Sequence, residues 1–288
     1  MKNNESSKTN LCNICPRGCK IDRRSTRGFC NENDTIKIAK IIEHFCWEEP
    51  CLSKDMGTLA IFFSGCNLRC DYCQNYEISR GGVGKEYSID EFVKLIEEKQ
   101  KDHDSIDLIT PTHFSLPLSK AFKKIKKLVP VIWNTNSYET IQNIGQVSKF
   151  VDVFLADLKY ANDSLGKKFS LCNDYATKTI DAIEKMCELK PDIESDGFLS
   201  QGVIIRHLVL PGHVENSIKV LDIIKELFPN RKVSIMSQFT PNGKSKLDRK
   251  ITPLEYKVVV AHLEKIGLEN GFIQDFDSAS SQFVPKFD

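Results

Sequence analysis

Three cysteines lie close together in the segment Ser64–Asn75, which reads SGCNLRCDYCQN. Cys66, Cys70 and Cys73 have the spacing C-x3-C-x2-C. Three thiolates on one short loop can hold three irons of a [4Fe–4S] cluster and leave the fourth iron open to another ligand. A structural zinc site would normally add a fourth protein ligand. We therefore interpret this segment as the ligand loop of an iron–sulfur centre, with a zinc loop or three incidental buried thiols as the alternatives.

A second group of cysteines precedes this loop, with the spacing C-x2-C-x3-C-x10-C. Its members are Cys12, Cys15, Cys19 and Cys30. Four thiolates can close a tetrahedral zinc site or hold a second [4Fe–4S] cluster, and the spacing does not separate the two. Arginines and lysines surround the group and could offset its negative charge. A solvated basic loop with free thiols is the alternative.

The chain contains 11 cysteines, and all but Cys172 and Cys187 precede residue 74. A disulfide framework is typical of secreted proteins, but the first ten residues lack the apolar core of a signal peptide. We therefore expect a cytoplasmic protein whose clustered cysteines bind metal. The longest stretch without a charged residue, Met56 to Leu68, is too short to cross a membrane. A formal net charge of +1 gives no reason to expect binding to nucleic acid or to a membrane surface.

The elements that must position these cysteines follow from the apolar pattern after residue 57. Six short runs rich in Val, Ile and Phe predict buried strands at 58–63, 105–110, 130–134, 151–158, 202–210 and 232–239. Amphipathic spacing predicts helices at 88–101, 116–128, 139–148, 174–189, 215–228 and 253–266. Strands that alternate with helices form a parallel sheet with right-handed crossovers. We predict an α/β fold, a partial (β/α)6 TIM-type barrel; a flat doubly wound sheet is the alternative.

This pattern also divides the chain. Residues 1–55 are expected to form a small Cys-rich extension that binds a metal or a cluster. Residues 56–250 are expected to form the partial barrel, and residues 251–288 a helix and tail that pack on it. The C-x3-C-x2-C loop then directly follows the first barrel strand, at the end where such folds place their sites.

The loop and its position resemble the radical S-adenosylmethionine (SAM) superfamily. The continuation into Gln74 and Asn75 is similar to the activases of glycyl radical enzymes, typified by pyruvate formate-lyase activating enzyme, and closer still to their PflX-type branch. Further motifs that carry this resemblance are Cys12-x2-Cys15-Pro16-x2-Cys19, WEEPC at 47–51, TPTH at 110–113, DLKY at 157–160, RHLVLPG at 206–212 and MSQFTP at 236–241.

The resemblance implies that a [4Fe–4S] cluster at Cys66, Cys70 and Cys73 binds SAM through its open iron. The chain would cleave SAM reductively to a 5′-deoxyadenosyl radical, which abstracts a hydrogen atom. Side chains at the carboxyl ends of the strands would then contact SAM. The expected cofactor-binding residues are Tyr72, Asn75, Thr110, Thr112, Asn134, Asn136, Asp157, Lys159, Arg206 and Gln238.

Each of these residues has an expected role. Tyr72 is expected near the adenine, with Gln238 flanking it, and Asn134 and Asn136 suit ribose hydroxyls. Where the superfamily often has Gly-Gly-Glu, this chain has Thr110-Pro-Thr112-His113, so the two threonines are the candidates for the SAM amino group. Asp157 and Lys159 alternate onto one face of a strand, where they can pair or bind SAM. Arg206 lies inside an apolar run, so it requires a carboxylate partner from the protein or from SAM.

The expected function is activation of a glycyl radical enzyme, with reduced flavodoxin or ferredoxin as the electron donor. Two alternatives remain open. The first is a radical SAM enzyme that modifies another peptide or a small molecule. The second is a non-catalytic iron–sulfur or zinc protein that serves as a carrier or scaffold.

Overall fold

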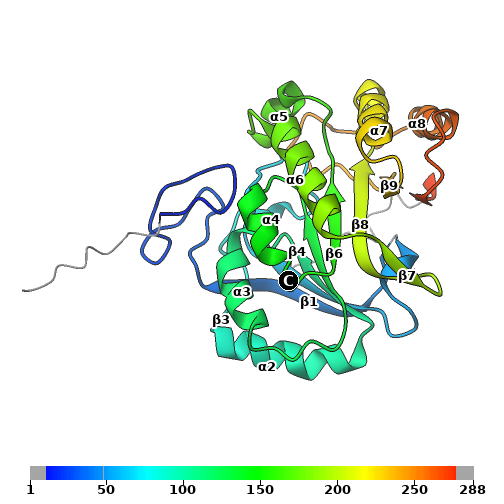
Figure 1. Cartoon of the computed structure of the whole chain (residues 1–288). Helices are drawn as coiled ribbons and strands as arrows, with labels where there is room; N and C mark the ends of the chain where they lie inside the picture. The colour runs from blue at the N-terminus through cyan, green and yellow to red at the C-terminus, as the bar shows by residue number, and fades with distance from the viewer. Residues whose placement is uncertain (1–10, 48, 277–288) are drawn as a thin grey trace, which may run out of the picture.

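The computed structural model describes residues 11–47 and 49–276 of the 288-residue chain. Its strands form one 10-stranded sheet in the order β10-β9-β8-β6-β5-β4-β2-β1-β3, while β7 pairs with β8 off this path. Figure 1 shows the sheet behind a layer of helices, with the amino-terminal segment standing to one side. No helix in the described ranges is long and apolar enough to cross a membrane.

The strands are β1 Ile36–Phe45, β2 Thr58–Phe63, β3 Lys85–Tyr87, β4 Ser105–Ile109, β5 Val131–Thr135, β6 Val153–Asp157, β7 Ile193–Ser195, β8 Phe198–Leu208, β9 Lys232–Met236 and β10 Gly271–Ile273. The α-helices are α1 Tyr76–Ser79, α2 Ile89–Lys99, α3 Ser115–Phe122, α4 Ile141–Val147, α5 Asp163–Ser170, α6 Tyr175–Leu189, α7 Val214–Leu227 and α8 Pro253–Lys265. Three short 3-10 helices are η1 Pro50–Leu52, η2 Gln100–Asp102 and η3 Thr112–Phe114.

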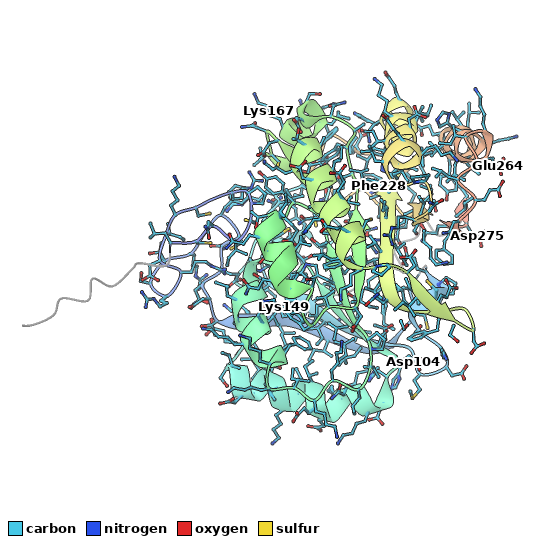
Figure 2. All side chains as sticks on the ribbon, viewed as in Figure 1. Asp104, Lys149, Lys167, Phe228, Glu264 and Asp275 are labelled. Carbon is cyan, nitrogen blue, oxygen red and sulfur yellow. The ribbon has the colours of Figure 1, made fainter. Side chains whose placement is uncertain are left out.

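Six neighbouring strands form the parallel core, and they are the six that the apolar runs predict. In sheet order they are β2, β4, β5, β6, β8 and β9, and each pairs in parallel with the next. The predicted α/β fold with a parallel sheet is therefore confirmed. Figure 2 labels Lys167 of α5, the helix that follows β6, at the top and Asp104, which precedes β4, near the bottom.

The two faces of the sheet are covered differently. On one face, strand residues such as Leu59, Trp133 and Phe154 pack with the helices in the main hydrophobic core. The opposite face carries two small clusters: Ile132, Val153, Leu155, Leu199 and Ile204 with Cys51 and Leu52 of η1, and Ala60, Phe62 and Ile109 with Ile78 of α1. Long helices therefore cover one face only among the described residues. This is the arrangement of a partial barrel, because a doubly wound sheet has helices on both faces.

Two expectations about elements need correction. β1 lies within the expected extension 1–55 but pairs antiparallel with β2, so it belongs to the sheet. Helix 116–128 is shorter than expected, because α3 ends at Phe122. The buried Gln100 side chain binds the oxygen of Lys126 and the amide of Leu128, both at 2.9 Å, and so takes backbone groups that a longer helix would need. Leu128, the last residue of the predicted helix, is exposed.

The expected carboxyl-terminal segment, residues 251–288, adds a helix and a strand to the fold. α8 begins at a capping box formed by Thr252 and Glu255 and packs against α7. β10 then pairs in parallel with β9, as a strand that the apolar runs did not predict. The remainder of the expected tail, residues 277–288, lies outside the described residues.

Candidate active site

A cavity of about 520 Å³ opens at the carboxyl ends of the parallel strands. Its wall includes the C-x3-C-x2-C loop and residues at the ends of β4, β5, β6, β8 and β9. Nearly all the side chains expected to form the site line it: Cys66, Cys70, Tyr72, Cys73, Asn75, Thr110, Asn134, Asn136, Asp157, Lys159, Arg206 and Gln238. The fold thus brings together residues that are up to 172 positions apart (66 to 238).

The cysteine loop is held in place by bonds from several distant elements. Asn67 donates to the oxygen of Tyr138 at 2.6 Å, and Asn242 donates to the oxygen of Asp71 at 2.7 Å. Gly65 starts the loop with a φ of 82°, and an added Cβ there would lie 2.6 Å from the oxygen of Cys30. Only glycine fits such a close approach with positive φ. The three thiols are therefore presented by a well-fastened loop.

Two of the three sulfur atoms have hydrogen-bond partners. The backbone amide of Leu68 and the side-chain amide of Asn136 donate to Cys66 Sγ at 3.3 and 3.4 Å. Ser170 Oγ lies 2.9 Å from Cys70 Sγ. Burial raises the pKa of all three thiols, and that of Cys73 to about 11. Thiols so buried become thiolates when a cationic metal centre offsets their charge. Three such donors in one cavity fit a [4Fe–4S] cluster that keeps one iron open.

A charged group faces the cavity from β6 and β8. Arg206 Nη2 lies 3.0 Å from Asp157 Oδ1, and Lys159 Nζ lies 2.5 Å from Asp157 Oδ2. Burial alone would raise the pKa of Asp157, but the charges of Lys159 and Arg206 outweigh it and lower that pKa. The carboxylate partner that the sequence requires for Arg206 is therefore Asp157. Two cations around one carboxylate leave a net positive charge that favours an anionic ligand.

Polar groups on the other walls are partly tied to the protein and partly open. Tyr72 and Tyr160 share a hydrogen bond of 2.7 Å, and Tyr160 reaches Ser170 at 2.7 Å. Arg206 Nη2 also donates to Asn134 Oδ1 at 2.7 Å. Asn75 Oδ1 is buried and has no hydrogen-bond partner among the described residues. An unpaired buried acceptor in a cavity wall is a natural contact for a ligand donor.

The segment Thr110–His113 departs from expectation. Thr110 lines the cavity, but Thr112 is fully buried and donates to Glu139 at 2.7 Å, so it is not available to the SAM amino group. His113 is likewise buried, with Nε2 2.6 Å from the oxygen of Ser64. Burial and the charge of Arg23 lower its pKa to about 3, so it stays neutral. η3 turns both side chains away from the cavity.

Several residues of the site were not identified from the sequence. Phe45, Cys46 and Trp47 leave β1 and form part of the cavity wall, with Arg206 5.8 Å from the centre of the Trp47 ring. Asp107 lies buried inside β4 and accepts from Asn134 at 3.1 Å. Burial raises its pKa to about 7. A signal for Asp107 existed, because an acidic residue within a buried apolar run requires a partner in the same way as Arg206.

Glu139 is the second buried acid that the sequence analysis missed. It accepts hydrogen bonds from Thr112, Trp133, Thr135 and Asn143 at 2.7 to 3.0 Å. These partners lie on η3, β5 and α4. Glu139 therefore joins the loops that follow β4 and β5, which carry part of the cavity wall.

The amino-terminal cysteines lie beside the cavity rather than in it. Their segment packs behind the cysteine loop, where Arg17 donates to the oxygens of Asn67 at 2.9 Å and Ser170 at 3.1 Å. Cys19 and Cys30 approach each other, since a Cβ built on Gly28 would lie 3.5 Å and 3.6 Å from their sulfurs. The amide of Phe29 donates to Cys19 Sγ at 3.4 Å. Burial raises the pKa of Cys30, while the charge of Arg23 opposes this.

Comparisons with known proteins identify the family of this chain. The family model of the radical SAM superfamily matches residues 60–237. The uncharacterized protein MJ0674 of Methanocaldococcus jannaschii is 30% identical over 272 residues, which cover 90% of this chain and 75% of that protein. The pyruvate formate-lyase-activating enzyme of Clostridium pasteurianum is 24% identical over 211 residues, which cover 68% of this chain and 82% of the enzyme.

Solved structures share the fold at low sequence identity. Streptococcus suis SuiB bound to S-adenosylmethionine superposes with a TM-score of 0.51 at 11% identity, over 77% of this chain and 51% of SuiB. TYW1 with a lysine-pyruvate adduct superposes with a TM-score of 0.51 at 10% identity, over 82% of each chain. The chain thus spans about half the length of SuiB. With the family model matched over most of its length, the chain belongs to the radical SAM superfamily and is an enzyme whose cofactors are a [4Fe–4S] cluster and SAM.

Proposed function

We propose that this enzyme is an activase of the pyruvate formate-lyase activating enzyme type, in its PflX-type branch, which removes the α-hydrogen of a glycine in a protein substrate. The observation that carries the proposal is the sharing of one cavity by the three cysteine thiols and the Asp157–Lys159 pair, the D-x-K that resembles the activases. The similarity to the Clostridium pasteurianum enzyme over 211 residues supports the same assignment.

Each wall of the cavity then has a proposed role. Cys66, Cys70 and Cys73 would hold the cluster, and the net positive charge of the Asp157, Lys159 and Arg206 group would receive the SAM carboxylate. Tyr72 and Gln238 would border the adenine, while Asn134 and Asn136 would face the ribose side. Thr110 and the unpaired Asn75 Oδ1 are left as contacts for the SAM amino group. When bound, the cluster and SAM supply a reductive carbon–sulfur cleavage and a radical that abstracts hydrogen.

We also propose the setting of the reaction. All 11 cysteines are free thiols in the structure, a state that a reducing cytoplasm maintains. Reduced flavodoxin or ferredoxin would supply the electron. The substrate would be a glycyl radical enzyme. Another peptide or a small molecule is the second candidate, because the relative that matches 90% of the chain is an uncharacterized protein.

The amino-terminal cysteines form a further proposed centre. We propose that Cys12, Cys15, Cys19 and Cys30 bind a second [4Fe–4S] cluster, with zinc as the alternative. The sulfur atoms of Cys19 and Cys30 both lie near Gly28, which supports a shared site. The hydrogen bond from the Phe29 amide to Cys19 Sγ is of the kind that thiolate ligands accept. The packing of this segment behind the cysteine loop would place the second centre beside the first.

The test begins with the protein reconstituted anaerobically with iron and sulfide. With dithionite and SAM, the parent should release 5′-deoxyadenosine, and a variant with Cys66, Cys70 and Cys73 replaced by Ala should not. Cys187→Ala is the matched control, because that thiol lies on α6 outside the cavity lining. Persistent cleavage in the triple variant would contradict the placement of the cluster.

A second measurement identifies the substrate. A candidate glycyl radical enzyme with deuterated glycine should transfer deuterium into 5′-deoxyadenosine and acquire a glycyl radical signal in electron paramagnetic resonance. Cleavage of SAM without deuterium transfer from any such enzyme, but with transfer from a peptide or small molecule, would favour the second candidate. A folded, iron-loaded protein that never cleaves SAM would instead indicate a carrier.

A further inference from the structure

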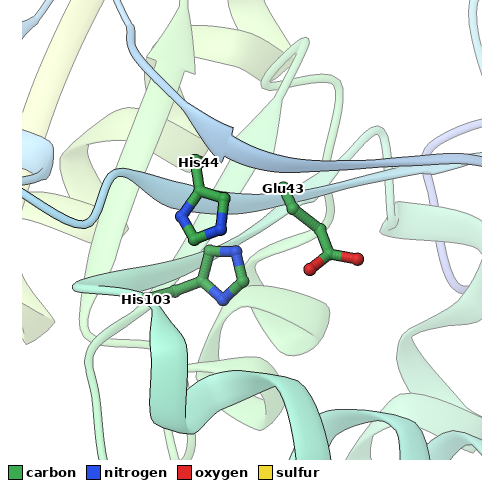
Figure 3. A group of neighbouring side chains, drawn as sticks. All are labelled: Glu43, His44 and His103. Carbon is green, nitrogen blue, oxygen red and sulfur yellow. The ribbon is translucent and has the colours of Figure 1, made fainter.

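A third group of possible metal ligands lies at the end of the barrel opposite the cavity. Glu43 and His44 are near the end of β1, and His103 follows η2 just before β4. One donor atom from each of the three side chains lies within 4.8 Å of the other two. Figure 3 shows the imidazole ring of His44 above that of His103, with the Glu43 carboxylate beside them.

In both imidazole rings, Nδ1 is the nitrogen that is hydrogen-bonded to a backbone oxygen. His44 Nδ1 lies 2.7 Å from the oxygen of Met56, and His103 Nδ1 lies 2.8 Å from the oxygen of Lys99. A carbonyl oxygen can only accept a hydrogen bond, so in each neutral ring Nδ1 carries the hydrogen and Nε2 offers its lone pair. Metal-bound histidines show the same arrangement, with the second ring nitrogen bonded to a carbonyl or carboxylate.

His103 gives independent evidence for a ligand. Its side chain is fully buried, and its Nε2 has no hydrogen-bond partner among the described residues. A buried, unpaired nitrogen is costly unless something binds it. The neighbouring imidazole of His44 stacks on it, with ring centres 4.6 Å apart, but stacking does not satisfy the lone pair.

The backbone is shaped to hold His44 in this position. The pairing of β1 with β2 shifts register between Ile42 and Phe45, and His44 within that bulge has a φ of 54°. Such a conformation is uncommon for a residue with a side chain and persists only where the surroundings impose it. Gly57 allows the close approach, because a Cβ there would lie 2.7 Å from the backbone carbon of His44.

We propose that Glu43, His44 and His103 bind one divalent transition-metal ion, for which zinc is the probe. Two imidazole nitrogens and a carboxylate oxygen are a ligand set that such ions prefer, and water would complete the coordination on the exposed side. Lys99 also pairs with Glu43 Oε1, so the metal uses the second carboxylate oxygen or displaces the ammonium. No cysteine is a member of this group, and the site does not depend on the proposed substrate.

The metal would fasten the point at which β1 leaves the sheet. The next three residues, Phe45, Cys46 and Trp47, line the cavity. A metal bound at His44 and His103 would therefore tie this part of the cavity wall to the start of β4. The proposed role of the metal is structural: it would stabilise the position of Phe45, Cys46 and Trp47 in the cavity wall.

The test uses the protein with its iron–sulfur centres assembled, so that the cysteines are occupied. After equilibration with zinc and removal of the excess, the parent should retain one zinc per chain. The double variant His44→Asn and His103→Asn should retain none. Asn tolerates the left-handed backbone at position 44, and its amide can replace the Nδ1 hydrogen bond at position 103. His262→Asn is the control, since His262 also pairs with a carboxylate, Asp222, on the surface.

X-ray absorption at the zinc edge decides where the ion sits. Nitrogen and oxygen ligands at about 2.0–2.2 Å support the proposal, whereas sulfur at about 2.3 Å would place the zinc on cysteines and overturn it. Equal zinc retention by the parent and the double variant also overturns it. Thermal unfolding in the presence of a chelator should be similar for parent and variant, which shows that the variant folds and that the lost zinc reflects lost ligands.

Discussion

At the scale of single residues, Arg206 shows how a charge is accommodated inside an apolar strand. Its guanidinium pairs with Asp157 at 3.0 Å and donates to Asn134 at 2.7 Å. Lys159 completes the group from the end of β6. All four side chains line the cavity, so the ionic contacts that make Arg206 tolerable also prepare a positively charged surface for a ligand.

The first prediction concerns this group. Arg206→Ala and Asp157→Ala should each weaken SAM binding by roughly 10- to 100-fold, about 1.4–2.8 kcal/mol, because Arg206 is a proposed contact of the SAM carboxylate and Asp157 holds Arg206 and Lys159 in position. Arg206→Lys should restore only part of the loss, since an ammonium lacks the planar fork with which the guanidinium contacts Asp157 and Asn134. Isothermal titration calorimetry measures the affinity, and the iron content should not change.

Arg231→Ala is the matched control, because Arg231 is also partly buried and pairs with Asp192 at 2.7 Å but does not line the cavity. If both cavity variants bound SAM as tightly as the parent, the proposed position of the SAM carboxylate would be wrong.

The second prediction concerns pH and His207, which faces away from the cavity. It is fully buried, with Nδ1 2.8 Å from the oxygen of Leu158 and Nε2 2.9 Å from Ser217 Oγ. Burial lowers its pKa from 6.5 to about 4. The unfolded chain therefore binds an extra proton between these values, so the free energy of unfolding should fall as the pH drops from 6.5 to 4, by at most about 3 kcal/mol from this residue.

Urea unfolding at pH 7 and at pH 4.5 measures this effect. His207→Asn should destabilise the protein at pH 7 but should show a smaller loss between the two pH values than the parent. The surface variant His262→Asn serves as the comparison. An unchanged loss in His207→Asn would mean that other groups account for the acid sensitivity.

At the scale of elements, Glu139 joins the segments that follow two strands. Its carboxylate is fully enclosed by donors from η3, β5 and α4, and burial raises its pKa although these hydrogen bonds oppose the shift. The loops after β4 and β5 contribute Thr110 and Asn136 to the cavity. The position of these wall residues thus depends on a buried acid that does not itself line the cavity.

The third prediction tests this role. Glu139→Ala should lower the free energy of unfolding by about 3–5 kcal/mol, because four buried donors lose their acceptor. Glu139→Gln should cost less, since its amide oxygen still accepts. Chemical denaturation measures both, and Glu98→Ala on the exposed face of α2 should change the value by less than about 0.5 kcal/mol. Similar losses in Glu139→Ala and Glu98→Ala would show that the hydrogen bonds do not stabilise the loops.

At the scale of the whole molecule, the amino-terminal segment and the barrel share a boundary at the cysteine loop. Arg17 contacts the ring of Phe29 at 3.8 Å, and Arg69 of the loop contacts the same ring at 4.4 Å. Thr140 donates to the oxygen of Ile14 at 3.0 Å. Residues 11–35 of this segment therefore support the cysteine loop from outside the cavity, and none of them lines the cavity.

The fourth prediction is that metal binding orders this segment. Replacement of Cys12, Cys15, Cys19 and Cys30 by Ala should remove about four irons per chain, or about one zinc if the alternative holds. Limited proteolysis should then cleave the variant between residues 11 and 35, since a short loop with little core depends on its metal for order. Metal analysis with unchanged values would reject the site, and Cys172→Ala is the control for loss of an unrelated thiol.

The sequence by itself determined the parallel core and the cysteine loop. Apolar runs identify β2, β4, β5, β6, β8 and β9 because strands buried on both faces have apolar residues at consecutive positions. The cysteine spacing lies within one loop, so its geometry is local. The need of Arg206 for a carboxylate was also evident, because burial of an unpaired charge is costly wherever the partner lies.

Only the tertiary structure decided which distant residues meet. It turned Thr112 toward Glu139 and away from the cavity, brought Phe45 and Trp47 into the cavity wall, and placed His103 beside His44. In β1, the charged residues Lys37, Lys40 and Glu43 interrupt the apolar run, and the strand joins the sheet through long-range pairing. The spacing of apolar residues indicates whether a segment is a helix or a strand. Contacts between elements form only when the sheet curves and its helices pack, and no short stretch of sequence contains that information.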